Sequence, residues 1–113
     1  MPNDPGPTQF GLPEKTITLI RTVFSRHPQV EQVILYGSRA KGTYKKGSDI
    51  DLTIKGDGVT LSELFQIENE LDDLLLPYKI DLSLMHKLGD PSLIEHVERV
   101  GRILYSAGTE YLL

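Results

Sequence analysis

The strongest constraint on this chain is a glycine-serine turn that is followed, after ten intervening residues, by two aspartates at strand spacing. Residues 33–36 are apolar and rich in strand formers, and they end at Gly37, where the backbone can turn sharply. Residues 38–41 can form a helical turn that Gly42 stops. A strand that leads through such a turn into a helix start presents free backbone N–H groups to an anion, and the Ser38 hydroxyl adds a donor. This stretch predicts a phosphate-binding turn.

Asp49 and Asp51 lie two residues apart on a strand predicted over residues 49–55, so their side chains share one face. Their α-carbons should be roughly 6.7 Å apart at the usual strand rise. Carboxylates at this spacing can hold two metal ions roughly 3.5–4 Å apart, and oxygen ligands suit Mg²⁺ or Mn²⁺ better than zinc. Ile50 and Leu52 point the other way, into the core.

A third carboxylate, Asp81, lies in a segment that alternates polar and apolar residues over positions 78–84. If this segment pairs beside the strand with the other two acids, Asp81 lies one strand spacing away, roughly 4.8 Å. Three carboxylates that close would repel by roughly 3 kcal/mol per pair at a moderate dielectric, so we expect cations to bind between them. A solvated strand aspartate would look the same as Asp81. An isolated Asp-x-Asp pair or Gly-Ser turn is also common, but their combination favours nucleotidyl transfer.

At these residues the chain resembles the DNA polymerase β-type nucleotidyltransferase superfamily, and its short length resembles the minimal nucleotidyltransferase (MNT) branch. The likeness runs from about residue 13 to residue 105. It implies that Gly37 and Ser38 bind the β- and γ-phosphates of a nucleotide. It implies further that Asp49 and Asp51 ligate two metal ions, and that Asp81 ligates the catalytic metal and acts as base for the acceptor hydroxyl.

The resemblance also implies a reaction and a partner. MNT proteins are commonly paired with an all-helical HEPN protein, and several are antitoxins that transfer AMP from ATP onto a tyrosine of that partner. We therefore expect a Mg²⁺-dependent adenylyltransferase that uses ATP and forms a hetero-oligomer with a HEPN-type protein. Two alternatives remain open: a non-catalytic antitoxin that neutralises its partner by binding, and a small-molecule nucleotidyltransferase of the aminoglycoside-modifying type. The intact turn and acids count against the first, and the small size of the chain counts against the second.

The charge distribution favours a polyphosphate ligand over a nucleic-acid duplex. The formal net charge of −4 argues against generic or sequence-specific nucleic-acid binding, yet residues 1–56 carry eight Lys/Arg against five Asp/Glu. Basic side chains near the motif are Arg39, Lys41, Lys45, Lys46 and Lys55. Arg39 and Lys41 are nearest to the turn, so we predict that they contact the nucleotide. For Lys45 and Lys46 a solvated loop explains the sequence equally well.

The remaining pattern predicts an α/β (α+β) fold in which helices pack on a small mixed β-sheet. We expect a flexible tail over residues 1–12 and a single nucleotidyltransferase domain over residues 13–113. The chain has no cysteine, no apolar run of membrane-spanning length and no signal-peptide pattern, so a cytoplasmic location is expected.

Local signals predict where the helices begin and end. Pro13 should open the first helix, a Thr60–Glu63 capping box the second, and an Asp90–Pro91 pair the third. Gly101 should end the third helix, before a last short strand. The three histidines are scattered and are predicted to be surface or capping residues; they are His27, His86 and His96.

Overall fold

The computed structural model describes residues 8–109 of the chain. The elements of the main body, in chain order, are α1 (Glu14–Ser25), β3 (Gln32–Tyr36), α2 (Ser38–Lys41), β4 (Ile50–Lys55), α3 (Leu61–Asp72), β5 (Ile80–Leu84), a 3₁₀ turn (Met85–Lys87), α4 (Pro91–Val100) and β6 (Arg102–Ser106). None of the helices in the described part of the chain is long and apolar enough to cross a membrane.

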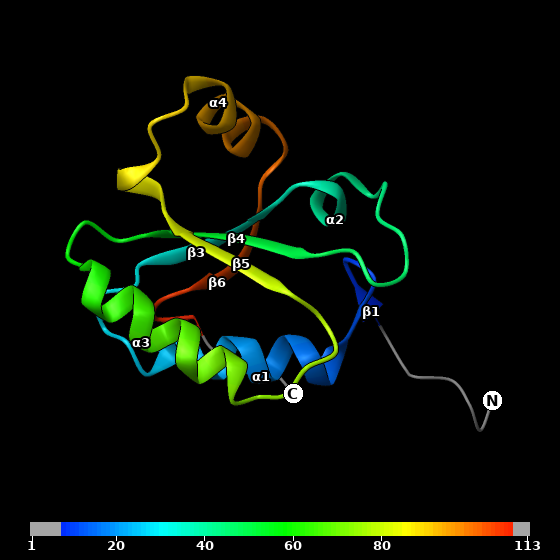
Figure 1. Ribbon diagram of the computed structural model, residues 1–113, viewed down its shortest axis with the longest axis horizontal. Helices are drawn as coiled ribbons and strands as arrows, with labels where there is room; N and C mark the ends of the chain where they lie inside the picture. Colours follow the sequence, from blue (N-terminus) through cyan, green and yellow to red (C-terminus); the bar gives the residue numbers. More distant parts are fainter. Residues whose placement is uncertain (1–7, 110–113) are drawn as a thin grey trace.

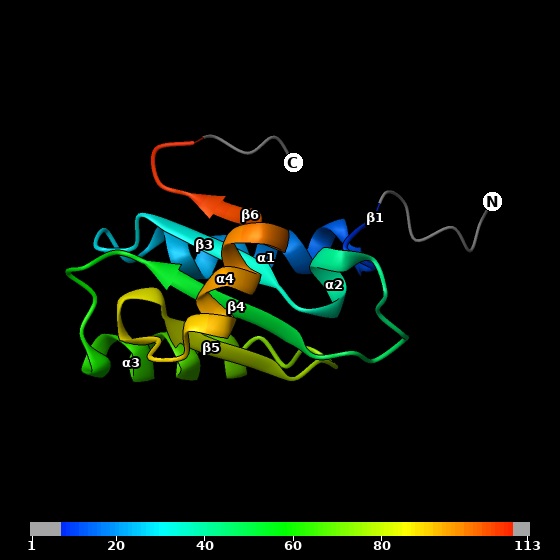
Figure 2. The ribbon, with the colours of Figure 1, turned by 90° about the horizontal axis from the view of Figure 1, so that it is seen from above.

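A four-stranded mixed sheet in the order β5-β4-β3-β6 forms the centre of the fold. Strand β3 is antiparallel to both β4 and β6, whereas β4 and β5 run parallel. Helices α1 and α3 cover one face of the sheet, and α4 lies over the other (Figure 1). Seen from the α4 side, this single helix leaves much of its face of the sheet uncovered (Figure 2). The mixed α/β architecture predicted from the sequence is confirmed.

Alternation along the strands divides the apolar side chains between the two faces. On β4, Ile50, Leu52 and Ile54 are fully buried beneath α1 and α3, as their period-2 spacing predicts. On β3, Ile34 and Tyr36 point to the opposite face, where they pack with Val97 of α4 in a second, smaller cluster. The face that carries the acids is therefore only partly apolar.

The predicted helix caps are present. The Thr60 hydroxyl accepts a hydrogen bond from the Glu63 N–H at 3.1 Å, and Asp90 Oδ1 accepts one from the Ser92 N–H at 2.9 Å. Pro91 follows at the first position of α4, and Gly101 is the residue after its end. The predicted final strand is β6.

Ordered structure begins earlier than the sequence indicated. Strand β1 (Thr8–Gln9) pairs with β2 (Leu12–Pro13) in a tight antiparallel hairpin. Leu12 is fully buried in the main core, which explains why this segment is held. Residues 8–12, which the sequence assigned to the tail, are thus part of the described fold, and residues 1–7 lie outside the described part.

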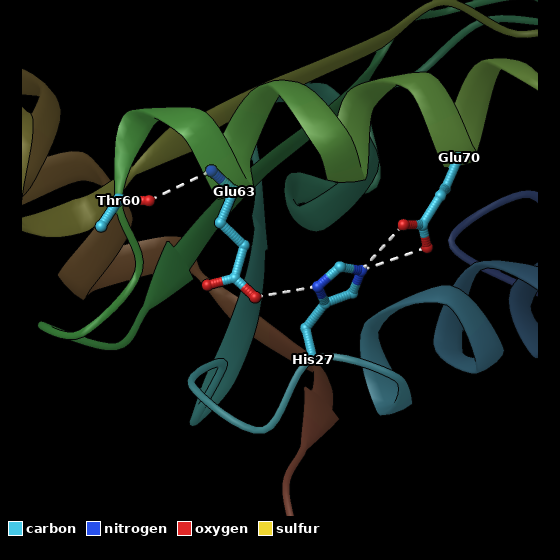
Figure 3. Close-up of polar contacts among 4 residues, drawn as sticks. All are labelled: His27, Thr60, Glu63 and Glu70. Carbon is cyan, nitrogen blue, oxygen red and sulfur yellow. Dashed lines mark hydrogen bonds and ion pairs between the residues drawn. The ribbon is translucent and has the colours of Figure 1, made fainter.

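His27 joins the end of α1 to α3. Its ring is only 6% exposed, and it lies between two glutamates of α3 (Figure 3). Nδ1 is 2.9 Å from Glu63 Oε2, and Nε2 is 3.1 Å from Glu70 Oε1. The prediction of a surface or capping histidine is therefore wrong here. The Glu63 carboxylate, expected in a capping box, contacts His27.

Candidate active site

Asp51 and Asp81 lie directly opposite each other on neighbouring strands. The parallel register of β4 and β5 makes their α-carbons partners, and in-register residues of paired strands project to the same face. Asp49 immediately precedes β4. Asp51 is half-buried, whereas Asp49 and Asp81 are exposed. The predicted pairing of the two acid-bearing strands is confirmed.

The charges of Asp49 and Asp81 act on the Asp51 carboxyl. Burial raises the pKa of the Asp51 carboxyl above its usual value near 3.8, and the charges of Asp81 and Asp49 raise it further. His96 and Lys79 act in the opposite direction. A concentration of negative charge on one sheet face would be stabilised by a cation.

The donor chemistry of these acids fits a hard divalent cation. All three supply carboxylate oxygens, which Mg²⁺ and Mn²⁺ prefer, and their mutual repulsion is the energetic reason to bind such an ion. Among residues 8–109, no three histidine, aspartate or glutamate side chains already stand close enough together to enclose a metal ion. The fit therefore rests on donor type and charge, and not on a preformed cage.

The glycine-serine turn lies beside Asp51. Strand β3 ends at Tyr36, whose α-carbon is the partner of Asp51, and Gly37 follows with a φ of +74°. A β-carbon added at Gly37 would collide with Asp51 Oδ2. Helix α2 then runs for four residues and stops at Gly42, which is left-handed. The predicted strand, turn and helix stop are confirmed, and the turn and the acids share one end of the sheet.

His96 contacts this turn, although the sequence predicted only a surface or capping histidine there. The Gly37 N–H donates a hydrogen bond to His96 Nε2 at 3.2 Å. The imidazole ring meets the Tyr36 ring edge-on, with centroids 6.2 Å apart. A signal was available, because His96 lies three residues after Leu93 and next to Val97, on the stripe of α4 that packs on the sheet.

Arg39 and Lys41 are placed differently by the fold. Arg39 is only 3% exposed, and its guanidinium donates to the carbonyls of Ser48 and Phe10. Lys41, at the end of α2, is exposed. The two cations that were predicted together as nucleotide contacts therefore differ: one is enclosed by protein groups, and the other is accessible to a ligand.

The sequence matches a known family over most of its length. Residues 19–110 match the profile of the family described as "Polymerase beta, Nucleotidyltransferase". The chain is 29% identical over 92 residues to "Putative protein adenylyltransferase MJ1217" of Methanocaldococcus jannaschii, which covers 74% of this chain and 93% of that protein.

Solved structures share the fold at lower identity. A chain from the crystal structure of a toxin-antitoxin with AMP-PNP has a TM-score of 0.64 and 21% identity, over 86% of this chain and 76% of that chain. A chain from a structure of the tri-AMPylated Shewanella oneidensis HEPN toxin in complex with MNT antitoxin has a TM-score of 0.62 and 17% identity. The match covers 83% of this chain and 72% of that chain. The family match spans the glycine-serine turn and all three acids, and the chain therefore belongs to the polymerase β nucleotidyltransferase family.

Proposed function

We propose that this protein is a Mg²⁺-dependent adenylyltransferase that moves AMP from ATP onto a tyrosine of a HEPN-type partner protein. The observation that carries the proposal is the in-register pairing of Asp51 with Asp81, on the sheet face next to the Gly37 turn. The name of the Methanocaldococcus relative, a protein adenylyltransferase, supports the reaction type. The structural likeness to a HEPN–MNT complex supports the class of partner.

Asp49, Asp51 and Asp81 are the residues that would hold the divalent ions. When bound, such ions neutralise phosphate charge and lower the pKa of an attacking hydroxyl. Bringing two ions to this face would also relieve the repulsion that raises the pKa of Asp51. The proposed requirement for Mg²⁺, with Mn²⁺ as a substitute, follows from the all-oxygen ligand set.

The chain's own groups would bind ATP and move one proton. In the proposed reaction, the Gly37–Ser38 turn binds the terminal phosphates, and exposed Lys41 adds positive charge nearby. Asp81 accepts the proton of the acceptor hydroxyl. The hydroxyl oxygen then bonds to the α-phosphorus of ATP, while the bond between that phosphorus and the oxygen that bridges it to the β-phosphorus breaks. Pyrophosphate leaves with the bridging oxygen. Positioning and charge stabilisation supply most of the acceleration in such transfers.

A tyrosine is a suitable acceptor because its phenolic proton, with a pKa near 10, is more easily removed than that of an aliphatic alcohol. The partner would be an all-helical HEPN protein held in a hetero-oligomer. The cytoplasm is the proposed location, since ATP and Mg²⁺ are both supplied there. The same complex would form if the protein were a non-catalytic antitoxin, so complex formation alone does not test the reaction.

The deciding experiment compares the wild type with a variant carrying Asp49→Asn and Asp51→Asn. Each protein is mixed with labelled ATP, Mg²⁺ and its HEPN-type partner, and transfer of label is measured alongside co-purification. We expect the variant to keep its fold and its partner while losing transfer. Labelling of the partner at the wild-type rate by this variant would disprove the catalytic assignment.

Ligand-induced stabilisation provides an independent test. Millimolar Mg²⁺ with ATP should raise the melting temperature of the wild type, because a ligand that binds only the native state stabilises it. The double variant should show a much smaller shift. An unchanged melting temperature of the wild type at saturating nucleotide would instead favour a non-catalytic antitoxin.

A further inference from the structure

Arg39 is a buried cation that three separate segments of the chain enclose. Its Nε and Nη2 both donate to the Ser48 carbonyl, at 3.1 and 2.8 Å, and Nη1 donates to the Phe10 carbonyl at 2.9 Å. The guanidinium carbon lies 5.3 Å from the ring centre of Tyr44 and 5.1 Å from that of Tyr78. No ion pair with a carboxylate is formed by Arg39 among residues 8–109.

Two of these three segments lead directly to the acids. Ser48, whose carbonyl Arg39 holds at two points, is the residue before Asp49. Tyr78 lies three residues before Asp81, just ahead of β5. The Ile50 N–H donates to the Lys79 carbonyl at 2.9 Å, so the segments that lead into β4 and β5 are also hydrogen-bonded to each other. Arg39 therefore contacts the backbone directly before Asp49 and the Tyr78 ring shortly before Asp81.

We propose that Arg39 is a positioning residue that sets the placement of Asp49 relative to Asp81 for metal binding, and that it does not bind the nucleotide phosphates. This inference rests on the proposed function and deepens it. The planar guanidinium is suited to the task, because it donates twice to one carbonyl while its central carbon lies over two aromatic rings. A lysine has no such fork, so a retained charge alone does not preserve the contact geometry. Residues that orient metal ligands in this way typically affect metal affinity by about 10–100-fold.

The test measures binding of Mn²⁺ alone, without nucleotide, by titration calorimetry. The variants are Arg39→Lys, which keeps the charge, and Arg39→Met, which keeps much of the volume. We expect both to bind Mn²⁺ at least about tenfold more weakly than the wild type. The matched control is Lys45→Met, which removes an exposed cation from the segment between α2 and β4 and should leave Mn²⁺ affinity unchanged.

Steady-state kinetics separate positioning from direct phosphate contact. At a fixed subsaturating metal concentration, we expect kcat of Arg39→Lys to fall with the loss of metal affinity. At saturating metal, KM for ATP should stay within about twofold of the wild-type value. A variant that binds Mn²⁺ like the wild type but has a raised KM for ATP would overturn the proposal and assign Arg39 to the phosphates. Unchanged metal binding together with unchanged kinetics would overturn it as well.

A further variant guards against loss of folding. Tyr44→Leu removes one aromatic face from Arg39 at a position that is itself exposed, and it should weaken Mn²⁺ binding in the same direction. Thermal melts of every variant identify those that are folded at the assay temperature.

A wild type that binds Mn²⁺ but transfers no AMP would refute the proposed function and leave the Arg39 test intact. A wild type that binds no Mn²⁺ would overturn the Arg39 proposal, since there would be no metal site to position.

Discussion

The carboxylate of Asp51 lies against the α-carbon of Gly37. Because Gly37 has a φ of +74° and a β-carbon there would meet Asp51 Oδ2, two independent constraints select glycine. The contact places the turn directly beside Asp51. It also makes Gly37 a place where a single methyl group tests the geometry of the site.

We expect Gly37→Ala to reduce AMP transfer by about a hundredfold, because displacing Asp51 misaligns the reacting groups. An alanine in this left-handed backbone conformation should also lower the free energy of unfolding by about 1–2 kcal/mol. Gly42→Ala is the matched control, because Gly42 has a φ of +83° and no atom near its added β-carbon. It should lose similar stability and retain most of its activity. Equal loss of activity in both variants would contradict the role of the Asp51 contact.

Asp51 should make the metal-free protein less stable as the pH rises above about 4. Its pKa is raised in the folded state by burial and by the two neighbouring acids, so the folded protein holds this proton more tightly than the unfolded chain. The free energy of unfolding should therefore fall as the pH rises from 3.8 through the higher folded pKa.

Urea unfolding of the wild type and Asp51→Asn from about pH 4 to about pH 7, without divalent ions, checks this expectation. The variant should be the more stable of the two at neutral pH, and we expect it to transfer no AMP. Added Mg²⁺ should stabilise only the wild type. The expectation fails if Asp51→Asn is the less stable protein at neutral pH without metal.

His27 should stabilise the fold more at about pH 6 than at about pH 9. Burial alone would lower its pKa, but the hydrogen bonds and charges of Glu63 and Glu70 outweigh burial, and the pKa lies above its usual value near 6.5. The stabilisation is then complete below about pH 6.5 and is lost as the pH rises through the folded pKa.

We expect His27→Gln to cost about 1–3 kcal/mol at about pH 6 and less at about pH 9, as measured by urea unfolding. Glu70→Gln should reduce the pH dependence without abolishing it, because Glu63 remains in place. An identical loss for His27→Gln at both pH values would show that the ring stabilises the fold by packing alone.

Removing the His96 acceptor should strengthen ATP binding. His96 Nε2 holds the Gly37 N–H, which is one of the donors that a bound phosphate would use. A hydrogen bond of this kind contributes about 0.5–1.5 kcal/mol, so KM for ATP should fall by up to about tenfold.

His96→Phe is the preferred variant, because it keeps an aromatic ring against Tyr36 while removing the acceptor. His86→Ala, which changes an exposed histidine of the 3₁₀ turn, should leave KM unaffected. A rise in KM for His96→Phe would show that His96 assists nucleotide binding and does not compete with it.

Features that depend on neighbouring residues in the chain could be predicted from the sequence. The Thr60 and Asp90 caps each need only two or three residues, and the alternation of Ile50 and Leu52 fixes which face of β4 carries the acids. The turn at Gly37 and the stop at Gly42 are equally local. These signals were sufficient to place Asp51 and Asp81 on strands, with Asp49 directly before the first of them. The structure supplies the pairing of the two strands.

Features that depend on distant residues could not be predicted. The burial of Arg39 requires Phe10, 29 residues away in sequence, and its contact with Tyr78 comes from the segment that leads into another strand. Likewise, His27 meets Glu63 and Glu70 only because α1 and α3 pack side by side. The sequence indicated that a cation lies near the turn, but not whether protein groups or a ligand would take up its donors.

The position of β5 at the margin of the sheet has a consequence for which molecules can be modified. Asp81 is exposed on this outermost strand, so the proposed base borders open solvent. An acceptor need not enter a deep cleft, and a side chain that projects from the surface of a large folded protein could reach it. Substrate choice would then depend on how the two surfaces dock, and grafting a different docking surface should redirect the enzyme to new targets.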